Sequence, residues 1–330
     1  MQASIGIIGA GAWGTALAVL WANAGRSVLL YTRSLEHARQ ITARRENAAY
    51  LPGIALPESV IVTDSLEQAG ACGLLALTMP AQAERDTLVK LREYYPDLHT
   101  PLLLCSKGIE LATGLLMTEV AAEIYPHAPL AVLSGPNFAG EVARGLPTAS
   151  VIACTHTDRR NDLAAFLSTP TFRLYGTEDV IGAEVAGAVK NVLAIACGIA
   201  YGRGLGENAR AAIITRGLAE IKRLAIARGA KSETLAGLSG LGDITLTCSS
   251  PTSRNMSFGA ALGQGQGAQS ILAQRQSVVE GVPTAGAVLA LAEHLKIEMP
   301  ICAAVHDVIT GRIQVEAAIR TLLERPLRQE

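Results

Sequence analysis

The sequence predicts an α/β protein whose N-terminal part is a doubly wound sheet and whose C-terminal part is entirely helical. Short apolar runs, typical of buried strands, alternate with helix-like segments up to about residue 180. Beyond that point long helical segments are broken by glycine-rich loops, and no run has the pattern of a strand. We therefore expect a first domain over residues 1–180 and a helical second domain over residues 181–330.

Eight strands are expected. The first six alternate with helix-like segments in several places, which indicates a parallel sheet with helices on both faces. The expected helices cover residues 15–24, 81–93 and 114–124, with a further helical segment around residues 35–41. The apolar runs that predict the strands are residues 4–8, 27–31, 60–63, 73–77, 102–105, 130–133, 149–153 and 172–175.

Composition limits the classes of function. Hydrophobic residues make up 49% of the 330 residues and charged residues 17%, which suits a large core. The formal net charge of −1, without a long run of Lys or Arg, argues against a nucleic-acid partner or a membrane-surface patch. Six cysteines without a Cys-x-x-Cys pair and six scattered histidines predict no metal site and a reducing, cytoplasmic compartment.

The N-terminal segment resembles a membrane helix only superficially. Residues 1–25 carry no charge, but the first cation is Arg26, so the basic start of a signal peptide is missing. Gly6, Gly9, Gly11 and Gly14 also interrupt the segment. We expect a buried strand, a turn and a buried helix here, with no membrane insertion.

The turn after the first strand carries Gly9-Ala10-Gly11-Ala12-Trp13-Gly14, a Gly-x-Gly-x-x-Gly motif. A strand before it, a helix after it and a second strand within about 30 residues are the context of a dinucleotide-binding, Rossmann-type turn. Gly9 permits the tight turn, Gly11 lets a pyrophosphate approach the backbone, and Gly14 lets the helix pack against the strand. The alternative is a glycine-rich turn that binds nothing.

The end of the second strand indicates which cofactor binds. A carboxylate there would accept from the ribose 2′-hydroxyl of NAD, but the chain has Tyr31-Thr32-Arg33-Ser34 instead. Arg33 is placed to meet a 2′-phosphate, which favours NADP and leaves NAD possible. The alternative is a surface arginine that stacks on adenine in either cofactor.

Lys190 is the single charged residue between Glu184 and Arg203, in a helix that is apolar or small on every face. A buried, unpaired ammonium is costly, so the lysine needs either a lowered pKa or a partner from another segment. Either outcome suits a general acid or base. The alternative is a lysine that reaches the surface at the edge of the helix.

Asp243 is likewise the single charge between Glu233 and Arg254, and it follows three closely spaced glycines. We expect a tight turn that directs the carboxylate inward, with Lys190 as its partner. An Asp that caps the next helix is the alternative.

The tripeptide Ser253-Arg254-Asn255 follows shortly after Asp243. It places a guanidinium between a hydroxyl and an amide, a combination that suits the binding of a phosphate. The alternative is that these residues only form an ordinary helix start.

Nine sequence blocks along the chain form a combined pattern. These blocks are Gly9-Ala-Gly-Ala-Trp-Gly-Thr-Ala-Leu, Asn47-Ala-Ala-Tyr-Leu-Pro, Ser106-Lys-Gly-Ile-Glu, Leu133-Ser-Gly-Pro-Asn-Phe-Ala, Ala188-Val-Lys-Asn-Val, Ala209-Arg-Ala-Ala-Ile-Ile-Thr-Arg-Gly, Gly240-Leu-Gly-Asp, Ser253-Arg-Asn and Val279-Glu-Gly. In this order, from about residue 4 to about residue 322, the chain resembles the bacterial NAD(P)-dependent glycerol-3-phosphate dehydrogenases.

The resemblance implies a role for each matching residue. Lys190 is similar to the family's catalytic lysine. The residues at substrate-binding positions are Lys107, Gly135, Asn137, Lys190, Asp243, Ser253, Arg254 and Asn255. Those at cofactor-binding positions are Gly9, Gly11, Trp13, Gly14, Arg33, Lys107, Ala139, Arg254, Val278 and Glu280. Two departures from the family pattern are Ala12, where serine is common, and Asn137, where Ser or Thr is usual.

The resemblance implies reversible hydride transfer between NAD(P)H and dihydroxyacetone phosphate, which gives sn-glycerol 3-phosphate for glycerophospholipid synthesis. Two alternatives stay open at this point. A β-hydroxyacid dehydrogenase of the same two-domain architecture would need a carboxylate site. A non-catalytic NAD(P)-sensing protein would have no reason to bury Lys190 and Asp243. The expected partners are small molecules, and a homodimer is left open.

Overall fold

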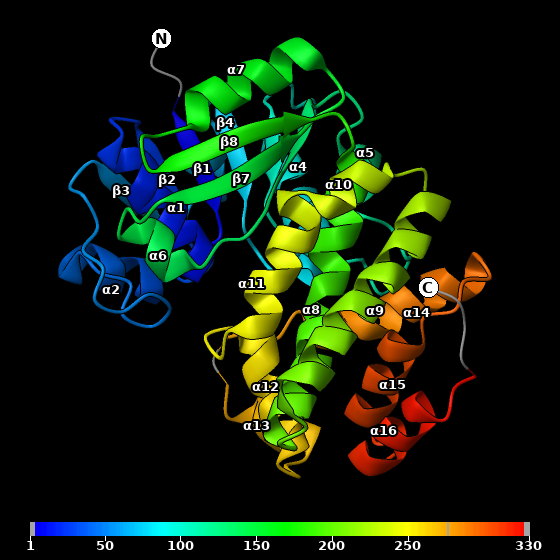
Figure 1. Cartoon of the computed structure of the whole chain (residues 1–330). Helices are drawn as coiled ribbons and strands as arrows, with labels where there is room; N and C mark the ends of the chain where they lie inside the picture. Colours follow the sequence, from blue (N-terminus) through cyan, green and yellow to red (C-terminus); the bar gives the residue numbers. More distant parts are fainter. Residues whose placement is uncertain (1–3, 276, 327–330) are drawn as a thin grey trace. The chain divides into compact units, whose positions relative to one another are not determined.

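The computed structural model describes residues 4–275 and 277–326 of the chain, which divides into two compact units (Figure 1). The first unit is Met1–Lys107 with Leu115–Glu184, and the second is Gly108–Gly114 with Val185–Glu330. Residues 108–114 therefore belong to the helical unit although their neighbours on both sides belong to the sheet unit.

The first unit is built on one eight-stranded sheet in the order β3-β2-β1-β4-β5-β6-β7-β8. The first six strands in this order give the arrangement 3-2-1-4-5-6 of dinucleotide-binding folds, in which the direction of winding reverses between β1 and β4. The strands are β1 (Ile5–Ile8), β2 (Val28–Tyr31), β3 (Val60–Thr63), β4 (Leu74–Leu77), β5 (Leu102–Leu104), β6 (Leu130–Ser134), β7 (Thr148–Ala153) and β8 (Phe172–Thr177).

One strand pairing was not predicted from the sequence. Strand β7 pairs antiparallel with β6, whereas every other neighbouring pair in the sheet is parallel. The connection over residues 135–147 contains only α6 (Ala139–Ala143), a helix of five residues that packs on α1. The crossover between two parallel strands usually contains a full helix, and this connection has only a short one, so the chain turns back instead.

Helices cover both faces of this sheet because each buried strand alternates its side chains between them. On one face Ile5 and Ile7 join a core that includes Leu17 and Trp21 of α1 (Ala12–Asn23). On the other face Gly6 lies directly against the backbone of α3 (Leu66–Gly70), so close that a side chain would overlap it. The other helices of this unit are α2 (Leu35–Arg44), α4 (Glu84–Tyr94), α5 (Met117–Ile124) and α7 (Thr157–Leu167).

The helices α3, α6 and α7 were missed from the sequence. The first two have only five residues each, too short to show a helical period. The third is mostly polar and buries only Leu163 and Leu167, so its apolar stripe is too narrow to recognise. Helix α1 also begins three residues earlier than expected, within the glycine motif itself.

Among the described residues the second unit has helices and no strand, and its segment Gly108–Gly114 lies outside the helices. Helix α8 begins in the first unit and is part of the second from Val185 onward, and α9 follows after a short glycine-containing turn. Its helices are α8 (Val180–Gly202), α9 (Gly206–Ala227), α10 (Ser232–Ala236), α11 (Asp243–Ser249), α12 (Arg254–Gly263), α13 (Ala268–Ala273), α14 (Gly281–His294), α15 (Pro300–Ile309) and α16 (Val315–Leu323).

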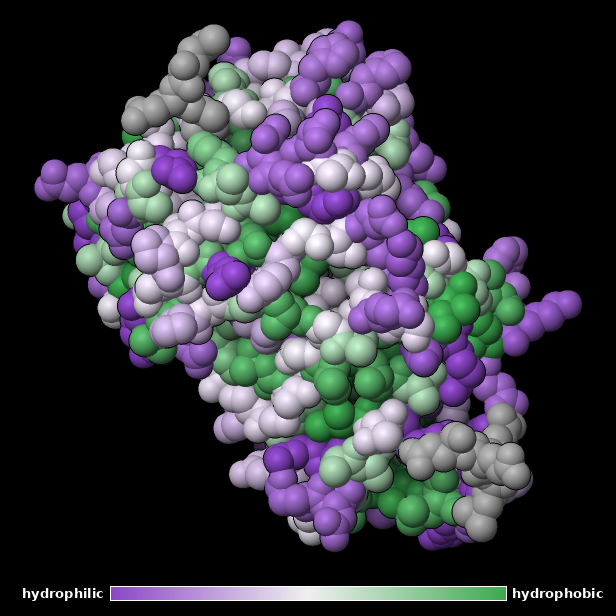
Figure 2. Space-filling model, turned by 45° about the horizontal axis from the view of Figure 1, so that its top comes forward, coloured by the Kyte–Doolittle hydropathy of each residue, from purple (hydrophilic) through white to green (hydrophobic). Residues whose placement is uncertain are grey.

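Helix α8 is long and apolar enough to cross a membrane, and it is the only described helix of which this is true. Of its most apolar 18-residue window, 89% is buried inside the protein. On the face drawn in Figure 2, hydrophobic residues form separate patches among hydrophilic ones.

Glycines bring α8 and α12 into direct backbone contact. A Cβ atom at Gly198 or Gly202 of α8 would overlap the backbone of Met256 or Ala260 in α12. In the other direction, a Cβ atom at Gly259 would overlap the carbonyl of Ile195. The two backbones therefore lie closer than any side chain allows, and this packing fixes α8 against the helix that begins at residue 254.

Gly198→Ala is expected to lower the free energy of unfolding by about 1–3 kcal/mol, because the added methyl overpacks a contact between two backbones. The matched control is Gly286→Ala in α14, where the nearest atoms would lie 3.4 Å or more from the new Cβ. That change should be neutral or stabilising by up to about 1 kcal/mol. Urea unfolding of both variants checks the pair, and equal effects would contradict the packing argument.

Candidate active site

The glycine motif forms the turn between β1 and α1, and its geometry fits a dinucleotide. Gly9 has a φ of +123°, which favours glycine, and a Cβ atom there would lie 2.9 Å from the backbone nitrogen of Met79. At Gly14 a Cβ would overlap the carbonyl oxygen of Gly9. A Cβ atom added at Gly11, by contrast, would have no neighbouring atom within 4 Å, so the space in front of the N-terminus of α1 is open. A pyrophosphate would bind at this helix N-terminus, because no side chain of Gly11 covers it.

The turn is held from the neighbouring strand. The Thr78 hydroxyl, just after β4, donates to the carbonyl oxygen of Gly9 at 2.8 Å. Trp13 and Ala139, two of the expected cofactor residues, lie at the starts of α1 and α6, and both pack around Ala16 and Leu51. The sequence did not single out Thr78, and only its position one residue beyond a strand end marks it.

Arg33 lies in the loop between β2 and α2 and is exposed. Ser34 next to it caps α2 by accepting from the backbone nitrogen of His37 at 3.2 Å. The residues from Tyr31 to Leu35 include no carboxylate that could accept from a 2′-hydroxyl. The position expected for Arg33, at the carboxyl end of the second strand, is the one observed.

Lys107, Gly135 and Asn137 lie together at the ends of β5 and β6. The Lys107 amine donates to the carbonyl oxygen of Gly135 at 3.0 Å, and the Asn137 amide donates to the same oxygen at 3.1 Å. Ser150 of β7 donates to the other end of the Asn137 amide at 2.8 Å. Gly135 has a φ of +141° and would meet the Cα of Ser150 at 3.0 Å if it carried a Cβ, so this loop requires glycine.

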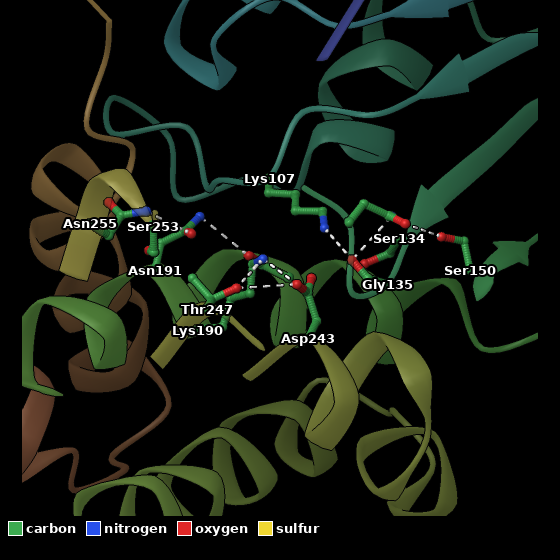
Figure 3. Close-up of polar contacts among 12 residues, drawn as sticks. Lys107, Ser134, Gly135, Ser150, Lys190, Asn191, Asp243, Thr247, Ser253 and Asn255 are labelled. Atoms are coloured by element: carbon green, nitrogen blue, oxygen red, sulfur yellow. Dashed lines mark hydrogen bonds and ion pairs between the residues drawn. The ribbon is translucent and has the colours of Figure 1, made fainter. Parts of the chain in front are cut away.

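In the second unit, Lys190 of α8 is 6% exposed and forms an ion pair with Asp243, which is fully buried (Figure 3). The partner expected from the sequence is therefore the observed one. The Lys190 amine also donates to the hydroxyl of Thr247 at 2.9 Å. Thr247 lies one turn after Asp243 on α11, so one helix presents two oxygens to one ammonium. Thr247 was not predicted from the sequence, although its four-residue spacing from Asp243 is the signal.

The turn before Asp243 has the form expected from its glycines. Residues Leu238–Gly242 make one wide, π-type turn that leads directly into α11. A Cβ atom at Gly240 would overlap the backbone of Leu235, so the turn closes tightly on α10. As a result Asp243 is the first residue of α11 and points inward rather than into solvent.

Two thiols lie beside this ion pair. Cys197 of α8 and Cys248 of α11 are fully buried. A hydrogen bond with Cys197, together with burial, raises the pKa of the Cys248 thiol well above its usual range. The Cys248 thiol therefore stays protonated beside Lys190 and Asp243.

The Ser253-Arg254-Asn255 block is the start of α12. Ser253 is buried and caps the helix by accepting from the backbone nitrogen of Met256, as the helix-start alternative anticipated. Arg254 is exposed on the first turn. Asn255 is buried, with its amide nitrogen donating to Asn191 and its oxygen accepting from Gly281, both at 2.9 Å. The amide of Asn255 thus ties three helices together and positions Arg254.

A second guanidinium, missed from the sequence, lies close to Arg254. Arg275 donates to the carbonyl oxygen of Arg254 at 3.0 Å, and burial followed by the charge of Arg254 lowers the pKa of Arg275. Two cations at the N-terminus of a ten-residue helix favour an anion there. The two remaining expected cofactor residues lie nearby in sequence, with Val278 46% exposed and Glu280 at the start of α14.

A six-strand dinucleotide-binding arrangement, a bare glycine turn and a buried lysine paired with an aspartate define a nicotinamide-dependent dehydrogenase. Family models agree: residues 4–160 match the N-terminal part of NAD-dependent glycerol-3-phosphate dehydrogenase, and residues 179–320 match its C-terminal part. The chain belongs to this family.

Individual relatives match over nearly the whole chain. The chain is 54% identical to a glycerol-3-phosphate dehydrogenase [NAD(P)+] of Rhodospirillum rubrum, over 99% of this chain and 93% of the relative. It is 52% identical to the protein of the same name from Caulobacter vibrioides, over 99% and 98%. The crystal structure of glycerol-3-phosphate dehydrogenase from Coxiella burnetii superposes with a TM-score of 0.94 at 38% identity, covering 98% of this chain and 99% of that one.

Proposed function

We propose that this chain catalyses reversible hydride transfer between NAD(P)H and dihydroxyacetone phosphate, giving sn-glycerol 3-phosphate for glycerophospholipid synthesis. The observation that carries the proposal is the Lys190–Asp243 pair, a buried proton donor held by a fixed carboxylate in a chain that matches this family over most of its length. The full-length relatives favour this substrate over the β-hydroxyacids of the alternative dehydrogenase.

The glycine turn after β1 and Arg33 would hold the cofactor, which would supply or accept a hydride when bound. Lys190 gives a proton to the C2 oxygen of the substrate as that oxygen gains negative charge, and takes the proton back in the reverse direction. Asp243 and Thr247 hold the lysine amine in one direction, which removes the cost of orienting it during the reaction.

The phosphate of the substrate would bind at the start of α12. Arg254 offers a planar set of donors, and the helix N-terminus offers backbone N–H groups and a partial positive charge. Arg275 adds a second positive charge behind Arg254. Binding energy at this end of the substrate can then orient its reacting carbon. For Lys107, Gly135 and Asn137, the shared hydrogen bonds support a rigid substrate-binding loop.

The cofactor preference follows from the end of β2, where Arg33 suits the 2′-phosphate of NADP.

The proposed location of the protein is the cytoplasm. The homodimer that the sequence left open stays a prediction, which light scattering of the purified chain would test.

The direct test is oxidation of NADPH and NADH in the presence of dihydroxyacetone phosphate. We expect turnover with this substrate and much less with β-ketoacids. Turnover restricted to a β-ketoacid would show the alternative dehydrogenase, and the absence of turnover with any substrate would leave a protein that only binds the cofactor.

Lys190→Ala should lower kcat by about 100-fold or more, the scale of lost general acid–base catalysis, while the affinity for NADPH is kept. Lys222→Ala on α9 is the matched control, because Lys222 is exposed. Steady-state kinetics and cofactor titration of both variants check the assignment. Near-native turnover of Lys190→Ala would rule out its catalytic role.

Arg33→Asp should shift preference from NADPH toward NADH. The charge that attracts a 2′-phosphate is replaced by a carboxylate that accepts from a 2′-hydroxyl. Arg39→Asp, an equal charge change at an exposed position on α2, should leave the preference unchanged. The measurement is the ratio of kcat/KM for the two cofactors, and an unchanged ratio in Arg33→Asp would contradict the proposed contact.

Arg254→Ala should lower kcat/KM for dihydroxyacetone phosphate by roughly 30- to 1000-fold, about 2–4 kcal/mol of transition-state stabilisation. Unphosphorylated dihydroxyacetone should be affected far less. Arg320→Ala on α16 is a control at an exposed arginine of the same unit. Both substrates are compared at saturating cofactor. If they lose the same factor, Arg254 does not recognise the substrate phosphate.

A further inference from the structure

The segment after α2 carries Asn47-Ala-Ala-Tyr-Leu-Pro, a block that the proposed reaction does not use. Asn47 is 1% exposed although its side chain is polar. Its amide nitrogen donates to the carbonyl oxygen of Ala10 at 2.9 Å and to the Thr15 hydroxyl at 2.8 Å. Ala10 lies inside the glycine turn and Thr15 in the first turn of α1, so one side chain holds both halves of the pyrophosphate site.

His37 on α2 determines which way this amide points. Because the carbonyl oxygen of Ala10 can only accept, the amide nitrogen must face it and the amide oxygen must face away. That oxygen lies 3.0 Å from Nε2 of His37, so Nε2 donates to it. Without this donor, a reversed amide would place its oxygen against the carbonyl of Ala10, where two acceptors repel each other.

The same histidine reaches the other end of the cofactor site. With Nε2 as the donor, Nδ1 of the neutral ring accepts, and the hydroxyl of Thr32 lies 3.2 Å from it. Thr32 is buried and directly precedes Arg33, the residue proposed to meet the 2′-phosphate. A continuous hydrogen-bonded chain therefore runs from Thr32 through His37 and Asn47 to Ala10.

Packing keeps the segment in place. Leu51 is buried against Ala16 of α1 and lies in one cluster with Trp13. The ring of Tyr50 lies 5.5 Å from the ring of His37, between centroids. The hydrogen-bonded chain thus sits on a fixed support, and its two ends cannot shift independently.

We propose that Asn47 and His37 are positioning residues that set the pyrophosphate turn and the 2′-phosphate end of the cofactor site together. The inference rests on the proposed binding of NAD(P). It predicts two separable effects: the link through Asn47 serves both cofactors, since both contain the pyrophosphate, whereas the link to Thr32 serves NADPH selectively.

Asn47→Asp tests the first link, because a carboxylate cannot donate to Ala10. The Kd values for NADPH and NADH, from titrations that follow nicotinamide fluorescence, should both rise about tenfold or more. The KM for dihydroxyacetone phosphate at saturating cofactor should not change. Asn161→Asp on α7 is the matched control, an equal change at an exposed position of the same unit, and should bind both cofactors as the native protein does.

Two substitutions of the half-buried His37 separate the links and are milder for folding. His37→Asn keeps an amide near Thr32 but is too short to donate to Asn47, so both Kd values should rise. His37→Gln can still donate to Asn47 but loses Thr32, so binding of NADH should be nearly native and only NADPH should weaken. Native-like affinities in Asn47→Asp and His37→Asn would overturn the inference while leaving the proposed function intact. A native protein that binds neither cofactor would overturn both.

Discussion

The buried ion pair between Lys190 and Asp243 is the constraint on which the second unit depends. Two charges with exposures of 6% and 0% are tolerable only if each stays within reach of the other. The helices that carry them, α8 and α11, must therefore keep one relative position. A shift of either helix by half a turn would leave a buried carboxylate facing apolar side chains.

The glycines of this unit meet that constraint by removing side chains from between backbones. Gly198 and Gly259 let α8 and α12 touch directly, and Gly240 lets the turn before Asp243 close on α10. Asn255 adds a directional bond, since its amide joins Asn191 of α8 to the start of α14. Close packing fixes the distance between α8 and α12, and the Asn255 amide fixes the rotation of α12 about its axis. The start of α12 is therefore placed with the same precision as the ion pair.

The features predicted correctly are those that depend on a residue's neighbours along the chain. Lys190 and Asp243 stood out because each is an isolated charge in a long apolar stretch, and burying one requires the other. The glycine turn stood out because its flanking strand and helix are local. The partners supplied by other segments were missed, among them Thr247, Arg275 and Thr78. In the sequence, a threonine or arginine that is exposed cannot be told from one that is hydrogen-bonded to a site residue. The antiparallel β7 was missed for a related reason, because strand direction depends on where a short connection packs and not on the strand's own residues.

The ion pair is held by its own side chains, whereas the glycine turn of the first unit must be free of them where phosphates bind. Phosphates can approach the backbone of the turn only where no side chain covers it, and Gly11 has open space where a side chain would be. The glycines of such a turn provide no side chains that could hold its backbone in shape. Its carbonyl groups are instead held from outside, Gly9 by Thr78 after β4 and Ala10 by Asn47 after α2. Rigidity is therefore supplied by residues far away in sequence, and a phosphate can reach the helix N-terminus without paying to order the turn.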